Sequence, residues 1–157
     1  MSIRPAKPGD EAELTRMCHE LAAFEKAAER CTVTENQMRT ALFGEPPTLH
    51  AHVAQVGGET AAGALWFYNF STWDGVAGIY IEDLYVRPNF RRRGLARALL
   101  STLARDCVEA GYTRLSWAVL DWNANAIALY ESVGGQPQGD WISYRVSGSA
   151  LSDLADS

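Results

Sequence analysis

Residues 91–96 read RRRGLA, and they lie between an apolar run at 79–86 and a helix-like run at 98–107. A strand, a turn with glycine and arginine, and a helix in that order can form an anion site. The glycine allows the backbone to approach a ligand, and the first amides of the helix have no internal partners. The helix dipole also favours negative charge at that point. The segment predicts a pyrophosphate site and so a nucleotide-like cofactor, while the alternative is a solvated arginine face.

Length and charge favour one domain that binds a small ligand. The 157 residues and the hydrophobic fraction of 47% are typical of one globular domain, which we expect to span 1–157. The net charge of -5 argues against a general nucleic-acid binder. Positive charge is nevertheless concentrated in one segment. Its members are Arg87, Arg91, Arg92, Arg93 and Arg97.

The cysteines and histidines indicate neither a disulfide framework nor a metal site. Cys18, Cys31 and Cys107 are odd in number and lack CxxC spacing. His50 and His52 alternate on a predicted strand, but no cysteine or carboxylate joins them in sequence. We expect structural or surface histidines and no bound metal. No run of residues is long and apolar enough to cross a membrane, and no signal peptide is visible, so the expected location is the cytoplasm.

Periodicity and turn signals predict alternating strands and helices. A helix follows a cap at Gly9-Asp10 and runs to Phe24, and Thr34 with Gln37 forms a capping box for a second helix ending at Leu42. Two turn signals follow, a hairpin at Gly57-Gly58 and a helix C-cap at Gly111. The remaining predicted elements are strands at 2–5, 50–56, 60–70, 78–86, 113–120 and 141–146, helices at 96–110 and 124–132, and a frayed end at 147–157.

A second motif lies in the predicted helix at 124–132. The residues from Asn123 to Gly134 read NANAIALYESVG and match the pattern N-x-x-A-x-x-x-Y-E-x-x-G. With R-x-x-G-x-A after the fourth strand, and with this order of elements, the chain resembles the GNAT superfamily of acyl-CoA-dependent N-acetyltransferases over nearly its whole length. The resemblance implies an α/β (α+β) fold with a central mixed, mostly antiparallel sheet of about six to seven strands and four main helices. It also implies that strands four and five splay to admit acetyl-CoA.

Short local strings are similar to those of the diamine (spermidine/spermine) and thialysine N-acetyltransferases. They are IRPA at 3–6, ELAAFE at 20–25, FGE at 43–45, YIEDLYV at 80–86 and WN at 122–123. That branch often has tyrosine where this chain has Phe24, so one hydroxyl contact to substrate is absent here. The resemblance implies a small cationic amine as substrate and a homodimer, without nucleic-acid or membrane partners.

The resemblance places acetyl-CoA on three segments. After a bulge in the fourth strand, backbone groups would pair with pantetheine and the thioester oxygen, as an added strand does. Asn123 and Tyr130 are seven residues apart, which puts them two turns apart on one helix face. The residues predicted to bind the cofactor are Leu84, Tyr85, Val86, Arg91, Arg92, Arg93, Gly94, Leu95, Ala96, Arg97, Asn123, Ala126 and Tyr130.

Acetyl transfer needs a neutral amine, a stabilised oxyanion and a proton for the departing thiolate. Tyr130 is the candidate acid because a phenol donates readily to a thiolate, and the alternative is a packing tyrosine. A substrate ammonium with a pKa of about 10.4 is mostly charged at pH 7. Glu82 is the candidate base, directly or through water, or it only recruits the cation. Glu82 and Asp83 are neighbours, so a regular strand would aim only one of them at the substrate; the alternative is a hydrogen-bonded pair at a strand end.

Further residues complete the predicted amine site. Phe24 and Glu25 end the first helix, which caps the active site in this superfamily, although a solvated helix end explains Glu25 equally well. Trp141 matches an aromatic residue near the polyamine groove, with a core tryptophan as the alternative. Lys26 follows Glu25 and weakens the local negative field. The predicted substrate-binding residues are Phe24, Glu25, Glu82, Asp83 and Trp141.

These residues predict acetyl transfer to a primary amine by direct attack in a ternary complex. We expect no acyl-enzyme, because Cys107 lies mid-helix on the apolar side. The acceptor stays open between a polyamine or diamine and a thialysine-like amino acid, and the carboxylate of the latter would need a basic partner that the sequence does not place. Two other functions also stay open, acetylation of an aminoglycoside or peptide amine and a non-catalytic acyl-CoA-binding module.

Overall fold

Five strands form one sheet in the order β1-β2-β3-β4-β5. The computed structural model describes residues 1–157 and divides them into two compact units, 1–123 and 124–157. The first three strand pairs are antiparallel and the pair β4–β5 is parallel. The mixed, mostly antiparallel sheet is therefore confirmed, with five strands in place of the six to seven predicted. The strands are β1 (Ser2–Pro5), β2 (His50–Val56), β3 (Glu59–Ser71), β4 (Val76–Val86) and β5 (Leu115–Trp117).

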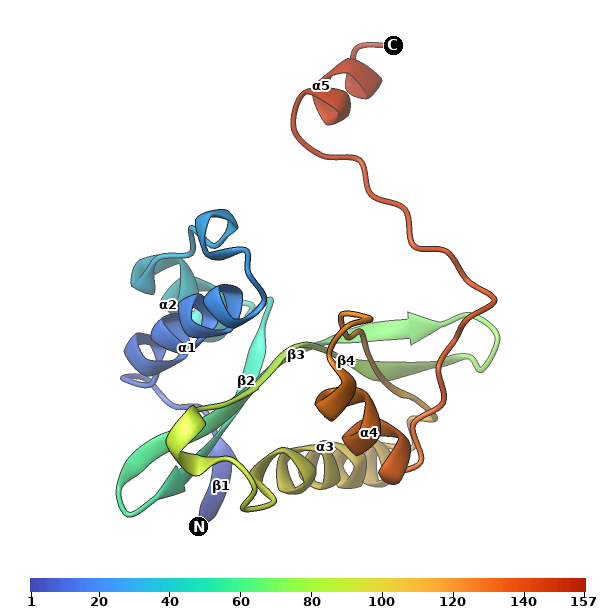
Figure 1. The fold of residues 1–157 in the computed structure, drawn as a ribbon. Coiled ribbons are helices and arrows are strands. Elements are labelled where there is room, and N and C mark those ends of the chain that lie inside the picture. The colour runs from blue at the N-terminus through green and yellow to red at the C-terminus, as the bar shows by residue number, and fades with distance from the viewer. The chain divides into compact units, whose positions relative to one another are not determined.

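Helices cover both faces of this sheet. In Figure 1, α1 and α2 lie on one face and α3 lies on the other. The core beneath α1 and α2 contains Leu14, Met17, Val53, Leu65 and Tyr85. The buried stripe of α3 consists of Leu95, Leu99, Leu100, Leu103 and Cys107. The helices of the first unit are α1 (Glu11–Phe24), α2 (Glu35–Phe43) and α3 (Leu95–Ala110), with 3-10 turns η1 (Ala28–Arg30) and η2 (Pro88–Phe90).

Two of the three predicted helix caps are present as expected, and the third differs. Thr34 Oγ1 accepts from the Gln37 amide at 3.1 Å, and Gln37 Oε1 accepts from the Thr34 amide at 3.0 Å, which confirms the capping box. Gly111, with φ of 78°, is the C-cap of α3 as predicted. Asp10 precedes α1, but its side chain does not cap the helix, because it pairs with Arg4 at 2.6 Å.

The second unit contains α4 (Ala124–Ser132) and α5 (Ser149–Ala155). The helix predicted at 124–132 is confirmed at both ends. The strand predicted at 141–146 is wrong, because these residues form no strand. Alternating apolar side chains favour a strand, but a strand also needs a neighbouring strand with which to form hydrogen bonds. A short helix replaces the frayed end predicted at 147–157. None of the helices has the length and apolar character needed to span a membrane. The single domain over 1–157 stays a prediction.

Candidate active site

A bulge in β4 separates the two neighbouring acids. Leu65 of β3 lies opposite Asp83, while the next residue, Trp66, lies opposite Ile81, so Glu82 is the extra residue. Residues directly opposite each other share a face of the sheet. Asp83 therefore lies on the face of Leu65, beneath α1, although regular alternation would have put it on the face of Ile81. The bulge expected in the fourth strand is present, at Glu82 itself, and Glu82 is exposed.

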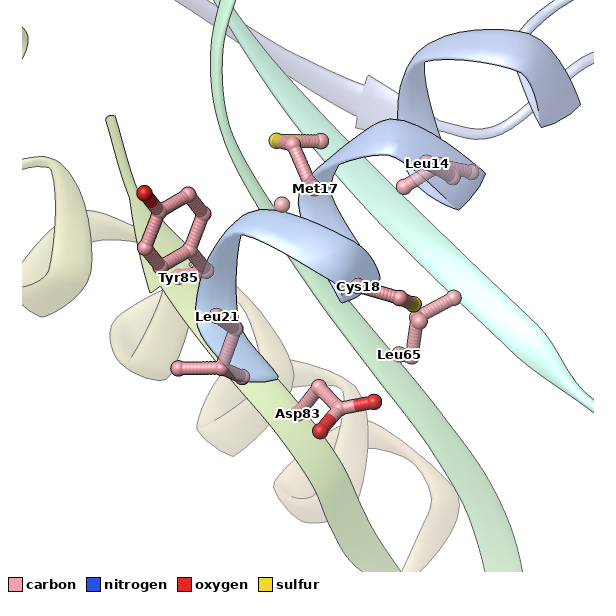
Figure 2. A pocket seen from close by; sticks show the side chains of 8 residues that line it. Leu14, Met17, Cys18, Leu21, Leu65, Asp83 and Tyr85 are labelled. Carbon is pink, nitrogen blue, oxygen red and sulfur yellow. The ribbon is translucent and has the colours of Figure 1, made fainter. Parts of the chain in front are cut away.

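Asp83 lines a small pocket between β4 and α1. Figure 2 shows Asp83 and Tyr85 projecting from β4 beside the α1 side chains that close this pocket. The cavity measures about 10 Å³, which is room for about one water molecule. Burial, with smaller contributions from the carboxylates of Glu82 and Glu25, raises the pKa of Asp83 to about 6. Asp83 consequently exchanges its proton near neutral pH.

Three predicted substrate-binding acids interact electrostatically around Asp83. Glu25 is the C-cap residue of α1, and burial raises the pKa of its carboxyl group. The charges of Glu25 and Glu82 both act on Asp83, so the three groups lie within electrostatic reach of one another. Such a cluster attracts a cation, because an ammonium relieves the repulsion among the carboxylates.

Aromatic rings and cations border the acids at the end of α1. The Phe24 and Trp122 ring centroids are 6.0 Å apart. The Arg91 guanidinium lies 5.1 Å from the Phe24 centroid, and the Lys26 ammonium lies 4.9 Å from the Trp122 centroid. Trp122 was missing from the predicted site residues, although the WN string at 122–123 was a signal that could have placed it there.

Cys18 is a thiol close to Asp83. It lines the same pocket as Asp83. Burial, with smaller contributions from Asp83 and Cys31, raises the pKa of the Cys18 thiol to about 12. A thiol that stays protonated at neutral pH is a poor nucleophile, so this group does not compete with the amine for an acetyl group.

The strand, turn and helix predicted from RRRGLA are confirmed. Gly94 is the N-cap residue of α3, has a left-handed φ of 76°, and is followed by helical amides with no side-chain cap. The first intrahelical bond runs from the Ala98 amide to the Gly94 carbonyl at 3.0 Å. The amides that precede it are those that an anion at a helix start uses.

The arginines of the positive segment differ in what they contact. Arg87 does not face the turn, because it forms salt bridges with Glu13 and Glu20 of α1. Arg91 donates from Nε to the Val86 carbonyl at 3.0 Å while it covers Phe24. Arg87, one of the five arginines of the positive segment, thus connects α1 to the end of β4.

The splay between the fourth and fifth strands is confirmed. β4 pairs with β5 only from Ile79 to Ile81, and β5 ends at Trp117 while β4 continues to Val86. The β4 edge over Leu84, Tyr85 and Val86 thus extends beyond β5. An extended molecule can add to a free strand edge through main-chain hydrogen bonds. The strand predicted at 113–120 is correspondingly short, because pairing stops where the splay begins.

The remaining predicted residues belong to the second unit or precede it directly. Ala126 and Tyr130 lie four residues apart on α4 and share one helix face. Asn123 precedes the first residue of α4, so the prediction that it lies on one helix face two turns from Tyr130 is corrected. Trp141 lies in the irregular segment before α5.

The histidines have structural roles, as predicted. His52 is buried, and its Nδ1 accepts a hydrogen bond from Trp66 Nε1 at 3.1 Å. The His50 ring stacks on Trp66 with centroids 4.7 Å apart. Both rings thus pack β2 against β3.

The sequence and the fold match a known family. The model of the acetyltransferase (GNAT) family matches residues 14–135. A thialysine N-epsilon-acetyltransferase of Caenorhabditis elegans is 42% identical over 153 residues, covering 95% of this chain and 93% of that protein. An L-ornithine N5-acetyltransferase of Arabidopsis thaliana is 27% identical, covering 95% and 85%. An integron cassette protein of V. cholerae superposes with a TM-score of 0.83 at 22% identity, covering 99% and 98% of the two chains.

The chain belongs to the GNAT acetyltransferase family, and it is an N-acetyltransferase. Members of this family use acetyl-CoA as the acyl donor. The resemblance found from the two sequence motifs is thereby confirmed, together with the branch that contains thialysine acetyltransferases.

Proposed function

We propose that the enzyme acetylates the primary amine of a small cationic acceptor, and that the acceptor is a thialysine-like amino acid. The observation that carries the proposal is that the charges of Glu25, at the end of α1, and of Glu82 both act on Asp83. Three carboxylates in one place select a cation. Relatives that act on thialysine and on ornithine support an amino acid with a terminal amine.

The acids remove the proton that keeps the amine unreactive. We assign this step to the Glu82–Asp83 pair, directly or through water, and the two carboxyl groups titrate as a pair because they interact. The nitrogen lone pair then attacks the thioester carbon in a ternary complex, and the carbon–sulfur bond breaks. Tyr130 gives its proton to the departing thiolate. The products are the acetylated amine and CoA, and no acyl-enzyme forms.

Acetyl-CoA itself binds to residues of three segments in this proposal. Its pyrophosphate lies at the helix start formed by Arg91, Arg92, Arg93, Gly94, Leu95, Ala96 and Arg97. Its pantetheine arm pairs with the β4 edge at 84–86, where an amide supports the oxyanion. Asn123, Ala126 and Tyr130 complete the cofactor site. Phe24 and Trp141 contact the acceptor. On the resemblance to the diamine branch, we also propose a cytoplasmic homodimer.

A direct assay tests the function. CoA thiol release from acetyl-CoA is measured with thialysine, lysine, ornithine, spermidine, putrescine, an aminoglycoside and a short peptide. We expect the highest kcat/KM with an amino acid that carries a terminal amine. Turnover of only the aminoglycoside or the peptide would assign another amine class. Silence across the panel with tight acetyl-CoA binding would indicate a non-catalytic binding module. Labelled acetyl-CoA mixed with the enzyme alone should leave no covalent label.

A further inference from the structure

Lys26 occupies a backbone position that normally belongs to glycine. Its φ is 61°, in the left-handed region. The Lys26 amide bonds to the Ala23 carbonyl at 3.1 Å and the Ala27 amide bonds to the Ala22 carbonyl at 2.9 Å, which is the Schellman ending of a helix. Glycine is preferred there because a side chain strains the left-handed conformation. The role of residue 26 in ending α1 therefore does not explain why this residue is a lysine, and another role for the lysine side chain is needed.

The Lys26 ammonium is held over an aromatic ring at the end of α1. It lies 4.9 Å from the Trp122 ring centroid, a cation–π contact that fixes its position. Trp122 in turn packs against Phe24, the last residue of α1. Lys26 therefore holds a cation at the end of α1, directly after Glu25 in the chain, whose charge acts on Asp83.

The neighbouring cations are already engaged, whereas Lys26 joins none of the salt bridges. Arg87 pairs with Glu13 and Glu20, and Arg91 donates to the Val86 carbonyl. A polyamine gains nothing from Lys26, because like charges repel. An acceptor with an ammonium at one end and a carboxylate at the other matches both the acids and the lysine.

We propose that Lys26 binds the α-carboxylate of the acceptor and thereby selects amino acids with a terminal amine over polyamines. The inference rests on the proposed function and supplies the basic partner that such a substrate needs. An ammonium–carboxylate contact is a charge-assisted hydrogen bond, among the stronger kinds in proteins. The strained backbone at residue 26 is then the cost of aiming this side chain.

The test compares thialysine with its carboxamide, which keeps both amines and lacks only the negative charge. We expect wild type to favour thialysine by roughly ten- to hundredfold in kcat/KM, the range of a hydrogen bond to a charged group. Lys26→Met should bring this ratio close to one, and Lys26→Arg should retain much of it. Lys7→Met is the matched control, because Lys7 is the only other lysine and precedes α1. Its ratio should equal that of wild type.

A glycine variant separates substrate binding from helix ending. Lys26→Gly removes the ammonium and also relieves the left-handed strain, so we expect a higher Tm together with a lost preference for thialysine. A lysine with only a structural role would leave the preference unchanged in this variant, and that result would overturn the assignment.

The failures of the two proposals are distinguishable. If wild type binds acetyl-CoA but acetylates no amine, the proposed function fails and the Lys26 assignment fails with it. If wild type acetylates thialysine and the carboxamide equally well, or if Lys26→Met keeps the wild-type ratio, only the Lys26 assignment is overturned.

Discussion

Asp83 connects the chemistry of the site to the stability of the fold. Burial, Glu82 and Glu25 raise its pKa from 3.8 to about 6. The folded state thus holds this proton more tightly than the unfolded chain, so stability declines as pH rises from about 4 to about 6. Above that range the ionised carboxylate costs the fold about 3 kcal/mol.

Replacing Asp83 should improve stability and impair catalysis together. At pH 7.5 we expect Asp83→Asn to raise the free energy of unfolding by roughly 1–2 kcal/mol, because a neutral amide escapes the repulsion. Its kcat/KM for the amine should fall by about tenfold or more. Urea unfolding at pH 7.5 and pH 4 measures the first effect, which should shrink at pH 4. A variant no more stable than wild type at pH 7.5 would contradict the raised pKa.

Tyr130→Phe tests the acid for the thiolate. Removing the phenolic proton should lower turnover by roughly 10²-fold, a typical contribution of general acid catalysis, while CoA affinity changes little. Single-turnover mixing measures the chemical step apart from product release. An unchanged single-turnover rate would take Tyr130 out of the acid role and leave it as a packing residue.

Single residues were predictable from the sequence where they stand in motifs, and contacts between distant residues were not. The acids and Tyr130 were predicted as site residues because they stand in motifs that suit acetyl transfer. Lys26 and Trp122 meet only in the folded chain, so no local pattern joins them. The neighbours Glu82 and Asp83 were also visible, but the choice of the face that each occupies required the register of β3 against β4.

Among the secondary structure elements, α3 offers a matched test of the anion site at its two ends. Gly94 and Gly111 have nearly equal φ values of 76° and 78°, and an added Cβ would meet no atom within 4 Å at either position. Alanine should therefore cost each variant about the same stability, on the order of 1 kcal/mol. Only Gly94→Ala should weaken CoA binding in calorimetry. Equal CoA affinity in the two variants would argue against a phosphate at the helix start.

Helices and strands were predicted well where the signal lies in neighbouring residues, and poorly where a distant strand must supply the pairing. The Thr34 capping box and the bounds of α4 depend on neighbouring residues, and both are confirmed. The segment at 141–146 alternates like a strand, yet a strand also needs an edge to pair with. β5 ends early for the same reason, because β4 and β5 diverge after Ile81.

For the whole molecule, the proposed homodimer can be measured directly. The β3–β4 hairpin extends past β2, whose last pair with β3 is His50–Trp66, and it carries Phe70 and Trp73 with exposed fractions of 64% and 82%. Large apolar side chains gathered on one exposed hairpin are typical of an interface. We expect light scattering to give twice the 17.2 kDa of one chain, and Trp73→Glu to shift the mass toward one chain. A monomeric wild type at micromolar concentration would contradict the homodimer.

The early end of β5 has a consequence for the handling of this protein. A strand edge that lacks a neighbour is a template on which other chains can add, and it promotes aggregation. In the proposed complex the pantetheine arm covers this stretch of β4. Bound CoA would then also protect the β4 edge from pairing with other chains. Protein stored with CoA should therefore aggregate more slowly than protein from which CoA has been removed.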